Sequence, residues 1–148
     1  MYKEVKGNIF DHERDYDVLV HGCNCYCTMG SGIARTIREL YPEAYEADCQ
    51  TKKGDRSKIG SFSYYIHPRK NLTIINAYTQ YNYYPRNIDH FEYEGFAKIC
   101  KDLNEQYKHK MCIAMPMIGA GLAGGNWNRI KKIIQDNIKD VNVTIYYI

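Results

Sequence analysis

The 148-residue chain carries a net charge of +3, and 45% of its residues are hydrophobic. A chain of this length and composition can bury a core as a single domain. Its apolar runs fall short of the roughly 18 residues that a membrane-spanning helix needs, which excludes that class of protein. The mild positive charge does not require a nucleic acid partner, but it is compatible with a phosphorylated small molecule. The polar N-terminus carries no signal peptide, which predicts a cytoplasmic protein.

Six cysteines raise the question of disulfides or a metal site. We expect no disulfides, because a chain without a secretory signal folds in a reducing compartment. Cys23, Cys25 and Cys27 are separated by single residues, which is not the spacing of a zinc site, and no matching Cys/His pair follows in the sequence. We therefore predict free thiols, no bound metal and no cofactor.

Hydrophobic periodicity predicts strands that alternate with helices. Alternating or continuous short apolar runs are typical of strands, whereas apolar residues spaced three and four apart are typical of helices. Strands are predicted at residues 2–5, 17–21, 62–67, 72–78, 111–117 and 141–148, and helices at residues 33–41, 43–50, 89–107 and 127–138. Residues 8–11 are predicted to open a loop, and Asn126 to cap the last helix.

The alternation of these elements predicts an α/β fold with helices on both faces of a central sheet. The apolar run before His21 predicts a strand that is covered on both faces. The sequence contains no internal repeat and no low-complexity linker. Residues 1–148 are therefore predicted to form a single domain.

Two glycine-rich loops each follow a predicted strand and lead into a helix. The first is GSGIA at residues 30–34, and the second is IGAGLAGG at residues 118–125. Their spacing matches neither the usual dinucleotide motif nor the P-loop. Helix N-termini bind anions through free N–H groups, and ligands of open α/β sheets bind beyond the strand carboxyl ends. We predict that both loops face one phosphate-containing ligand; a tight turn with close helix–sheet packing is the alternative for the first loop.

Taken together, these segments make the sequence similar to the macrodomain family, the ADP-ribose-binding α/β/α modules. The resemblance covers essentially the whole chain, and the nearest pattern is the branch of ADP-ribose 1″-phosphate phosphatases. It implies a three-layer α/β/α fold with a mixed central sheet. The segments that carry the resemblance are Lys6–Ile9, with Asn8 where Asp is usual, His21–Cys25, Gly30–Ala34, and Met115–Gly121 followed by Trp127.

The resemblance also implies a set of ligand-binding residues. Asn8 and Ile9 are expected to contact the adenine, and Asn24 is expected to contact the distal ribose. Gln80 is expected to reach the same ligand-binding crevice, together with Asn76 and Thr79. Neither phosphate loop carries Lys or Arg, so backbone dipoles must hold the anion. The residues expected at the phosphates are Gly30, Ser31, Gly32, Ile33 and Ala34 in the first loop, and Ile118, Gly119, Ala120, Gly121 and Leu122 in the second.

His21 and Asn24 are the predicted catalytic residues. An imidazole at residue 21 would activate water for attack on phosphorus or protonate the departing ribose oxygen. The alternative for His21 is a structural histidine bonded to a backbone carbonyl. Trp127 is expected to anchor its helix, and His90 and the tyrosines at 81, 83 and 84 to form a loop surface, with one tyrosine available to cover the adenine or ribose.

The predicted activity is binding of ADP-ribose and hydrolysis of ADP-ribose 1″-phosphate to ADP-ribose and phosphate. The expected partner is this nucleotide alone, with no membrane or nucleic acid, and the chain is expected to be a monomer. The alternatives are a non-catalytic ADP-ribose-binding module, and a hydrolase acting on ADP-ribosylated macromolecules or on O-acetyl-ADP-ribose. A sister branch of the family uses a Lys and an Asp to remove ADP-ribose from glutamate. Here Ala123 aligns with that Asp and Gln80 or Tyr81 falls near that Lys, so this mechanism is not expected.

Overall fold

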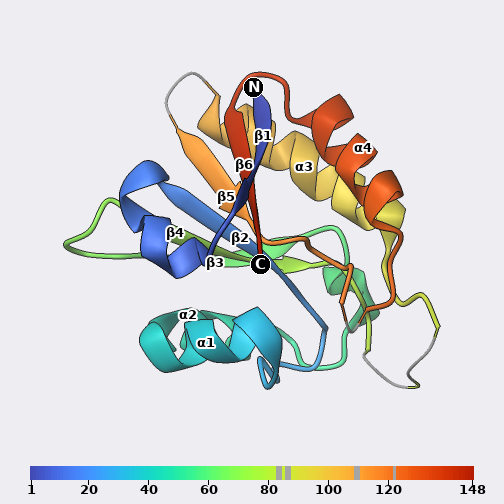
Figure 1. Ribbon diagram of the computed structural model, residues 1–148. Coiled ribbons are helices and arrows are strands. Elements are labelled where there is room, and N and C mark those ends of the chain that lie inside the picture. Colours follow the sequence, from blue (N-terminus) through green and yellow to red (C-terminus); the bar gives the residue numbers. More distant parts are fainter. Residues whose placement is uncertain (83–84, 86–87, 109–110, 122) are drawn as a thin grey trace.

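A computed structural model shows a six-stranded sheet between two helical layers (Figure 1). The structure describes residues 1–82, 85, 88–108, 111–121 and 123–148. The strands, in chain order, are β1 (Tyr2–Lys6), β2 (Val18–Cys23), β3 (Phe62–Ile66), β4 (Thr73–Tyr78), β5 (Cys112–Met115) and β6 (Asn142–Tyr147). The helices are α1 (Gly32–Leu40), α2 (Pro42–Cys49), α3 (Tyr93–Tyr107) and α4 (Trp127–Asn137), with 3-10 helices η1 (Ile9–Asp15) and η2 (Arg56–Lys58).

The spatial order of the strands is β1-β6-β5-β2-β4-β3. All neighbouring pairs are parallel except β3 and β4, which are antiparallel. This confirms the mixed central sheet. Because β2 pairs in parallel with both β4 and β5, the carboxyl ends of these three strands lie at one edge of the sheet.

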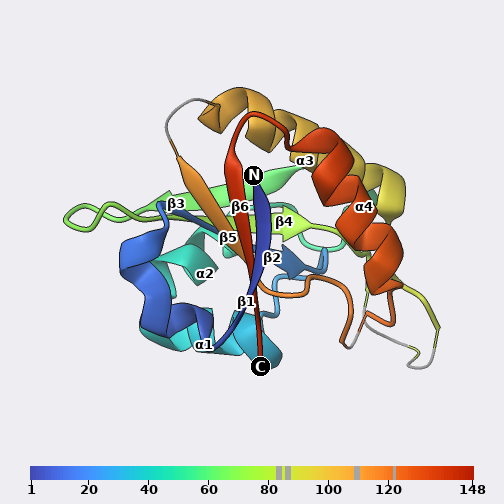
Figure 2. The same cartoon turned by 45° about the horizontal axis from the view of Figure 1, so that its top comes forward.

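Helices α1 and α2 cover one face of the sheet and α3 and α4 cover the other, as both ribbon views show (Figures 1 and 2). Alternation along β2 divides its side chains between the two layers. Leu19 packs with Ile37 and Ala44 on the α1–α2 face, whereas Val18 and Val20 pack with the residues of α3 and α4. The three-layer α/β/α architecture is therefore confirmed.

The predicted elements agree with the structure except near some of their ends. The segment at residues 8–11, predicted to open a loop, instead begins η1, because the Asn8 side chain accepts a hydrogen bond from the N–H of Phe10 and caps the helix (3.0 Å). The third long helix begins at Tyr93 rather than at residue 89. Asn126 caps α4 as predicted, since its Oδ1 accepts from the N–H of Arg129 (3.2 Å).

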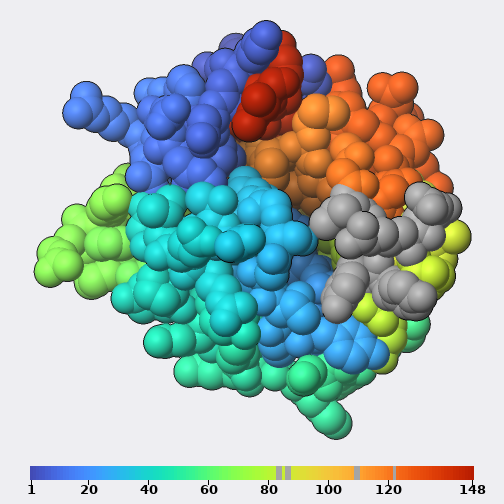
Figure 3. Space-filling model, turned by 60° about the horizontal axis from the view of Figure 1, so that its bottom comes forward, coloured from blue at the N-terminus to red at the C-terminus, as the bar shows by residue number. Residues whose placement is uncertain are grey.

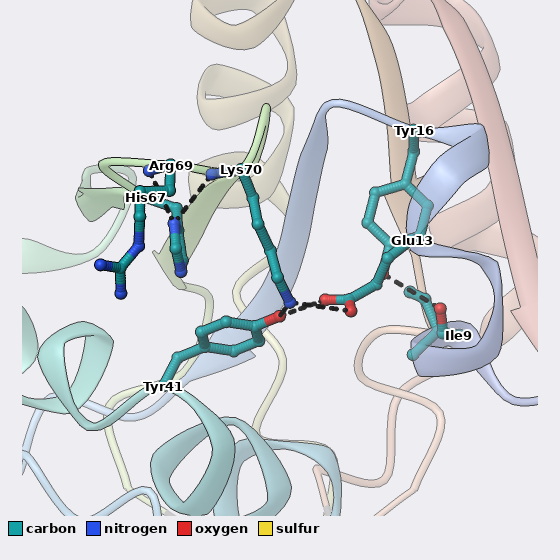
Figure 4. Close-up of polar contacts among 7 residues, drawn as sticks. All are labelled: Ile9, Glu13, Tyr16, Tyr41, His67, Arg69 and Lys70. Carbon is teal, nitrogen blue, oxygen red and sulfur yellow. Dashed lines mark hydrogen bonds and ion pairs between the residues drawn. The ribbon is translucent and has the colours of Figure 1, made fainter.

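Polar contacts attach η1 to the helical layer and to the turn between β3 and β4. Glu13 accepts a hydrogen bond from the Tyr41 hydroxyl and forms an ion pair with Lys70 (3.5 Å), whose ammonium also donates to Tyr41 (2.9 Å). Figure 4 shows these three side chains meeting from separate parts of the chain. Tyr16 follows η1, and its hydroxyl donates to the carbonyl of Ile9 (3.0 Å), which connects the two ends of this helix.

Two further predictions concern the cysteines and membrane-spanning helices. All six cysteines are free thiols, as predicted. Within the part of the chain that the structure describes, no helix is both long and apolar enough to cross a lipid bilayer.

Candidate functional site

A cleft of about 460 Å³ lies beyond the carboxyl ends of β2, β4 and β5. The segments that follow these three strands form its walls, and α2 contributes one side chain. In Figure 3 the first loop and α1 form a light-blue and cyan surface, which lies next to the orange surface formed by the segment of the chain around β5. The described lining residues are Gly22–Asn24, Thr28–Ala34, Asp48, Thr79, Gln80, Pro116–Gly119, Gly121 and Ala123. The two glycine-rich loops therefore converge on one cleft, as the sequence predicts.

The first loop presents the N-terminus of α1 to this cleft. Gly32 begins the helix with φ +58°, a left-handed backbone that glycine adopts without strain. The N–H groups of Gly32, Ile33 and Ala34 belong to the first helical turn, where they have no partner inside the helix. Cys27 and Met29 also have positive φ values, 57° and 40°, which are uncommon for residues with side chains and cluster at functional sites. This loop is held in a shape suited to an anion.

Asn24 shapes the loop as well as lining the cleft. Its Oδ1 accepts from the N–H of Tyr26 (2.8 Å), and its Nδ2 donates to the Thr28 hydroxyl (2.8 Å). The amide oxygen retains a second lone pair for a ligand. The ribose contact predicted for Asn24 therefore stays a prediction, with the amide already positioned by the loop itself.

The second loop is a series of tight turns. Gly119 has φ +77°, and a Cβ at this position would lie 2.6 Å from Cε1 of Phe91. The N–H of Gly125 donates to the carbonyl of Gly119 (2.7 Å) and closes the loop. The N–H of Ala120 donates to the carbonyl of Met117 (3.2 Å), and Ala120 is not among the described residues that line the cleft. The phosphate contact predicted for Ala120 does not fit this geometry, because the turn uses its amide.

Ile118, Gly119 and Gly121 do line the cleft, as does the predicted Gln80. The Gln80 side chain donates to the carbonyl of Asn82 (3.0 Å). Leu122 lies outside the described residues, and so do the tyrosines at 83 and 84. Trp127, predicted to anchor its helix, packs against the core beneath α3 and α4.

Asn8 and Ile9 were predicted to contact the adenine, but neither is among the described residues that line this cleft. Asn8 is exposed and uses its side chain to cap η1, and Ile9 is buried in the core on the α1–α2 face. Both adenine contacts were implied by the resemblance to the family, and in the structure Asn8 acts as a helix cap and Ile9 as a core residue. An adenine contact would require the ligand to extend beyond the cleft.

His21 is fully buried and is not among the described lining residues. Its Nε2 lies 2.7 Å from Oδ1 of Asn76, whose Nδ2 donates to the carbonyl of Ala44 (2.9 Å) and to the Ser63 hydroxyl (3.0 Å). Burial lowers the pKa of His21 to about 4, so its imidazole is neutral near pH 7. This position does not fit the direct proton transfer predicted for His21, because the ring is enclosed between the sheet and α2 rather than exposed at the cleft surface. The burial agrees with the alternative of a structural histidine, but the ring contacts the side chain of Asn76 where that alternative expected a backbone carbonyl.

Sequence reasoning missed Asp48, which α2 places in the cleft lining. Asp48 lies one turn after Ala44, and these are the two fully buried residues of α2. That four-residue spacing was the available signal, but an acidic residue in a polar helix is usually exposed. Burial raises the pKa of the Asp48 carboxyl above its usual range.

Two polar atoms at this cleft are buried without a partner within the described ranges: Oδ2 of Asp48 and Oγ1 of Thr79. A buried polar atom left unpaired costs about 1–3 kcal/mol. Both residues line the cleft. A bound molecule that reaches these atoms from the cleft would supply the missing hydrogen bonds.

The charge of the lining is unusual for an anion site. Among the described lining residues, Asp48 is the one charged side chain, and neither Lys nor Arg occurs. Backbone N–H groups must hold any phosphate in this cleft. The carboxylate of Asp48 would repel a phosphate placed against it, which divides the cleft into a region suited to anions and a region suited to hydrogen-bond donors.

The macro domain family model matches residues 20–134 of the chain. This chain belongs to the macro domain family. A 17.5 kDa protein of Enterobacteria phage T4, described as uncharacterized and encoded in the tk-vs intergenic region, is 36% identical over 97% of this chain and 94% of its own length. An ADP-ribose 1″-phosphate phosphatase of Candida albicans is 25% identical over the full length of both chains. The macrodomain of Thermus aquaticus DarG has a TM-score of 0.76 and 25% identity, covering 99% of this chain and 97% of that structure.

Family membership confirms the resemblance drawn from the sequence motifs. The matched segment contains both glycine-rich loops, β5 and the part of β2 from residue 20 onwards. The macrodomain fold is thus shown by the family match and by the architecture of the sheet and its layers.

We expect Gly119→Ala to lower the free energy of unfolding of this macrodomain by about 2–4 kcal/mol, because the new Cβ combines a left-handed backbone with overlap against Phe91. Urea denaturation followed by circular dichroism measures the change. Gly121→Ala is the matched control, since no atom lies within 4 Å of its Cβ position, and we expect a change below about 1 kcal/mol. Equal effects of the two substitutions would contradict this account of the second loop.

We expect His21 to reduce stability at acidic pH. Because the folded-state pKa of His21 is about 4, below the usual 6.5, folding favours the neutral ring. The stabilising contribution is complete above pH 6.5 and is lost as pH falls from 6.5 towards 4, with a slope of at most about 1.4 kcal/mol per pH unit. His21→Gln should flatten the dependence of unfolding free energy on pH within this window. A slope identical to that of the unsubstituted protein would show that His21 does not carry the effect.

Proposed function

We propose that this macrodomain binds ADP-ribose and hydrolyses the terminal phosphate of ADP-ribose 1″-phosphate, giving ADP-ribose and inorganic phosphate. The observation that carries the proposal is the convergence of the α1 N-terminus and the second glycine-rich loop on one cleft. The full-length relative named as an ADP-ribose 1″-phosphate phosphatase supports the choice of substrate.

In this proposal the first helical turn of α1 and the second loop hold the diphosphate from two sides. Gly30–Ala34 provide one wall, and Ile118, Gly119 and Gly121 provide the other. Backbone amides suit this task because their dipoles are fixed before the ligand arrives. Asn24 and Gln80 lie in the same lining and are the proposed amide side chains for the ribose.

In the hydrolysis, a water oxygen forms a bond to phosphorus as the bond from phosphorus to the ribose 1″-oxygen breaks. The ribose oxygen gains a proton and the water loses one, so the products are a ribose hydroxyl and a phosphate ion. The fixed amides of the loops stabilise the charge that develops on the phosphoryl oxygens. His21 does not enter this step directly, because its ring is enclosed.

A non-catalytic ADP-ribose-binding domain is the second candidate. The observation that favours it is the composition of the cleft, whose described lining contains one carboxylate, no histidine and no lysine. Hydrolysis of ADP-ribosylated macromolecules or of O-acetyl-ADP-ribose is a third candidate, and a Thermus aquaticus relative named DNA ADP-ribosyl glycohydrolase is 27% identical over 99% of this chain and 41% of its own length. One observation counts against the Lys–Asp mechanism of the sister branch. At the position where a sister branch has its Asp, the buried Ala123 offers no carboxylate.

Two measurements on one sample separate these functions. We expect calorimetric titration to show binding of ADP-ribose at micromolar concentration, and an assay with ADP-ribose 1″-phosphate to release inorganic phosphate. Binding without phosphate release would favour the non-catalytic domain. If ADP-ribose does not bind, both functions are wrong for this chain even though the fold is that of a macrodomain.

A charge placed at the first loop tests whether the phosphates lie there. Ser31→Glu adds a carboxylate next to the N-terminus of α1, and we expect it to weaken ADP-ribose binding at least about tenfold by repelling the diphosphate. Leu40→Glu adds the same charge at the exposed end of the same helix and should leave the affinity within about twofold. Calorimetry measures both variants. Equal weakening by the two would mean that net charge, rather than this loop, determines binding.

A further inference from the structure

The Asp48 carboxyl is held at one oxygen and free at the other. Its Oδ1 accepts a hydrogen bond from the Tyr78 hydroxyl (2.6 Å), whereas Oδ2 has no partner among the residues described. The side chain is 1% exposed, yet the residue lines the cleft. Its backbone carbonyl accepts from the Thr51 hydroxyl (2.6 Å) and the Cys27 thiol (3.3 Å), which holds the end of α2 in place.

A chain of hydrogen bonds connects this carboxyl to His21 on β2. The Tyr78 hydroxyl lies 2.8 Å from the Ser63 hydroxyl, and the chain continues from Ser63 to Asn76 (3.0 Å) and from Asn76 to His21 (2.7 Å). These residues come from β2, β3 and β4, on the face of the sheet that α2 covers. The chain thus crosses three strands beneath one helix.

The donors of this chain can be assigned in one direction. Asn76 Nδ2 donates to Ser63, so its Oδ1 accepts from His21 Nε2–H. Tyr78 donates to Asp48, so its oxygen accepts from the Ser63 hydroxyl. Every proton in the chain therefore points towards Asp48. Hydrogen bonds aligned in this way polarise one another and stabilise a negative charge at the accepting end.

The free oxygen of such a carboxylate requires a hydrogen-bond donor. The phosphates of ADP-ribose have no donor at neutral pH and would be repelled, whereas ribose hydroxyls are donors. Asp48 also lies against the segment that leads into the first loop, since its carbonyl receives the Cys27 thiol. The cleft thus places a hydroxyl-binding group beside its anion-binding wall.

We propose that Asp48 is a sugar-binding residue of this cleft, whose Oδ2 accepts a hydrogen bond from a hydroxyl of the ligand's terminal ribose, and that the chain from His21 through Asn76, Ser63 and Tyr78 positions its carboxylate. The proposal rests on the proposed binding of ADP-ribose. It gives the buried His21 a positioning role at the far end of the chain, away from the ligand.

The test compares ADP-ribose with ADP, which lacks the terminal ribose. We expect Asp48→Asn to weaken ADP-ribose binding about tenfold in calorimetry, because a charge-assisted hydrogen bond is lost. The affinity for ADP should change less than about twofold. Glu46→Gln removes the same charge from the exposed face of α2 and should alter neither affinity. Thermal unfolding by circular dichroism checks that each variant is folded.

The pattern of losses decides the proposal. Equal loss for ADP-ribose and ADP, or no loss for either, would overturn the contact with the terminal ribose. If the unsubstituted protein binds no ADP-ribose, the proposed function itself fails. If it binds ADP-ribose and Asp48→Asn behaves as the unsubstituted protein does, only the role of Asp48 fails.

The positioning chain has its own test in the pH dependence of binding. Asp48 is faced by Tyr78 from β4, Lys58 from η2 and Cys23 from β2, and the Tyr78 hydrogen bond and Lys58 favour its ionised form against burial. Tyr78→Phe removes the last hydrogen bond of the chain. Loss of this bond should raise the pKa of the Asp48 carboxyl. As the pH is lowered, we therefore expect the affinity of this variant for ADP-ribose to begin to fall at a higher pH than that of the unsubstituted protein. The affinity for ADP should show no such shift. Coincident pH profiles would show that the chain does not act on Asp48.

Discussion

The parallel pairing of β2 with β4 and β5 is the constraint on which the site depends. It sets the carboxyl ends of three strands side by side, and residues far apart in the sequence leave the sheet at the same edge. The first loop follows β2, Thr79 and Gln80 follow β4, and the second loop follows β5. A cleft at this edge is the expected position for a ligand in an open α/β sheet. The helical layers stabilise this arrangement by burying both faces of β2.

The lining of the cleft combines two kinds of group, namely backbone amides that suit an anion and a carboxylate that suits hydrogen-bond donors. In the proposed function its walls hold an anion through backbone amides of a helix N-terminus and a tight loop, without a described cationic side chain in the lining. Fixed dipoles act over a short range, so they can bind an anion without placing a positive side chain in the cleft beside Asp48. Lys58, which faces Asp48 from outside the described lining, favours the ionised form of its carboxyl. The carboxylate therefore remains available for hydroxyl donors. In this proposal the backbone amides of the loops, which carry only dipoles, bind the anion, and the charged carboxylate of Asp48 binds the hydroxyl.

The buried polar residues under α2 form one connected unit. His21, Asn76, Ser63, Tyr78 and Asp48 follow one another through hydrogen bonds of 2.6 to 3.0 Å. Polar groups in a core are stable only when their hydrogen bonds are satisfied, and this chain leaves one Asp48 oxygen unsatisfied at the cleft. A histidine that is neutral because of burial can donate along the chain without adding a second charge to the core.

Sequence alone determined the order and type of the six strands and the four α-helices, the edge of the sheet at which the cleft lies, and the family, but not the 3-10 helix η1. The spacing of hydrophobic residues distinguishes a strand from a helix locally. Two glycine-rich loops that each follow an apolar strand are predicted to lie at the same edge of the sheet. Tertiary structure decided the roles of individual polar residues. His21 and Asn76 are 55 residues apart, Asp48 and Tyr78 are 30 apart, and the burial of these groups depends on α2 packing across β4. Periodicity reports that a face is buried but not which groups meet on it, so the enclosure of His21, the exposure of Asn8 and the placement of Asp48 in the cleft emerge only from the fold.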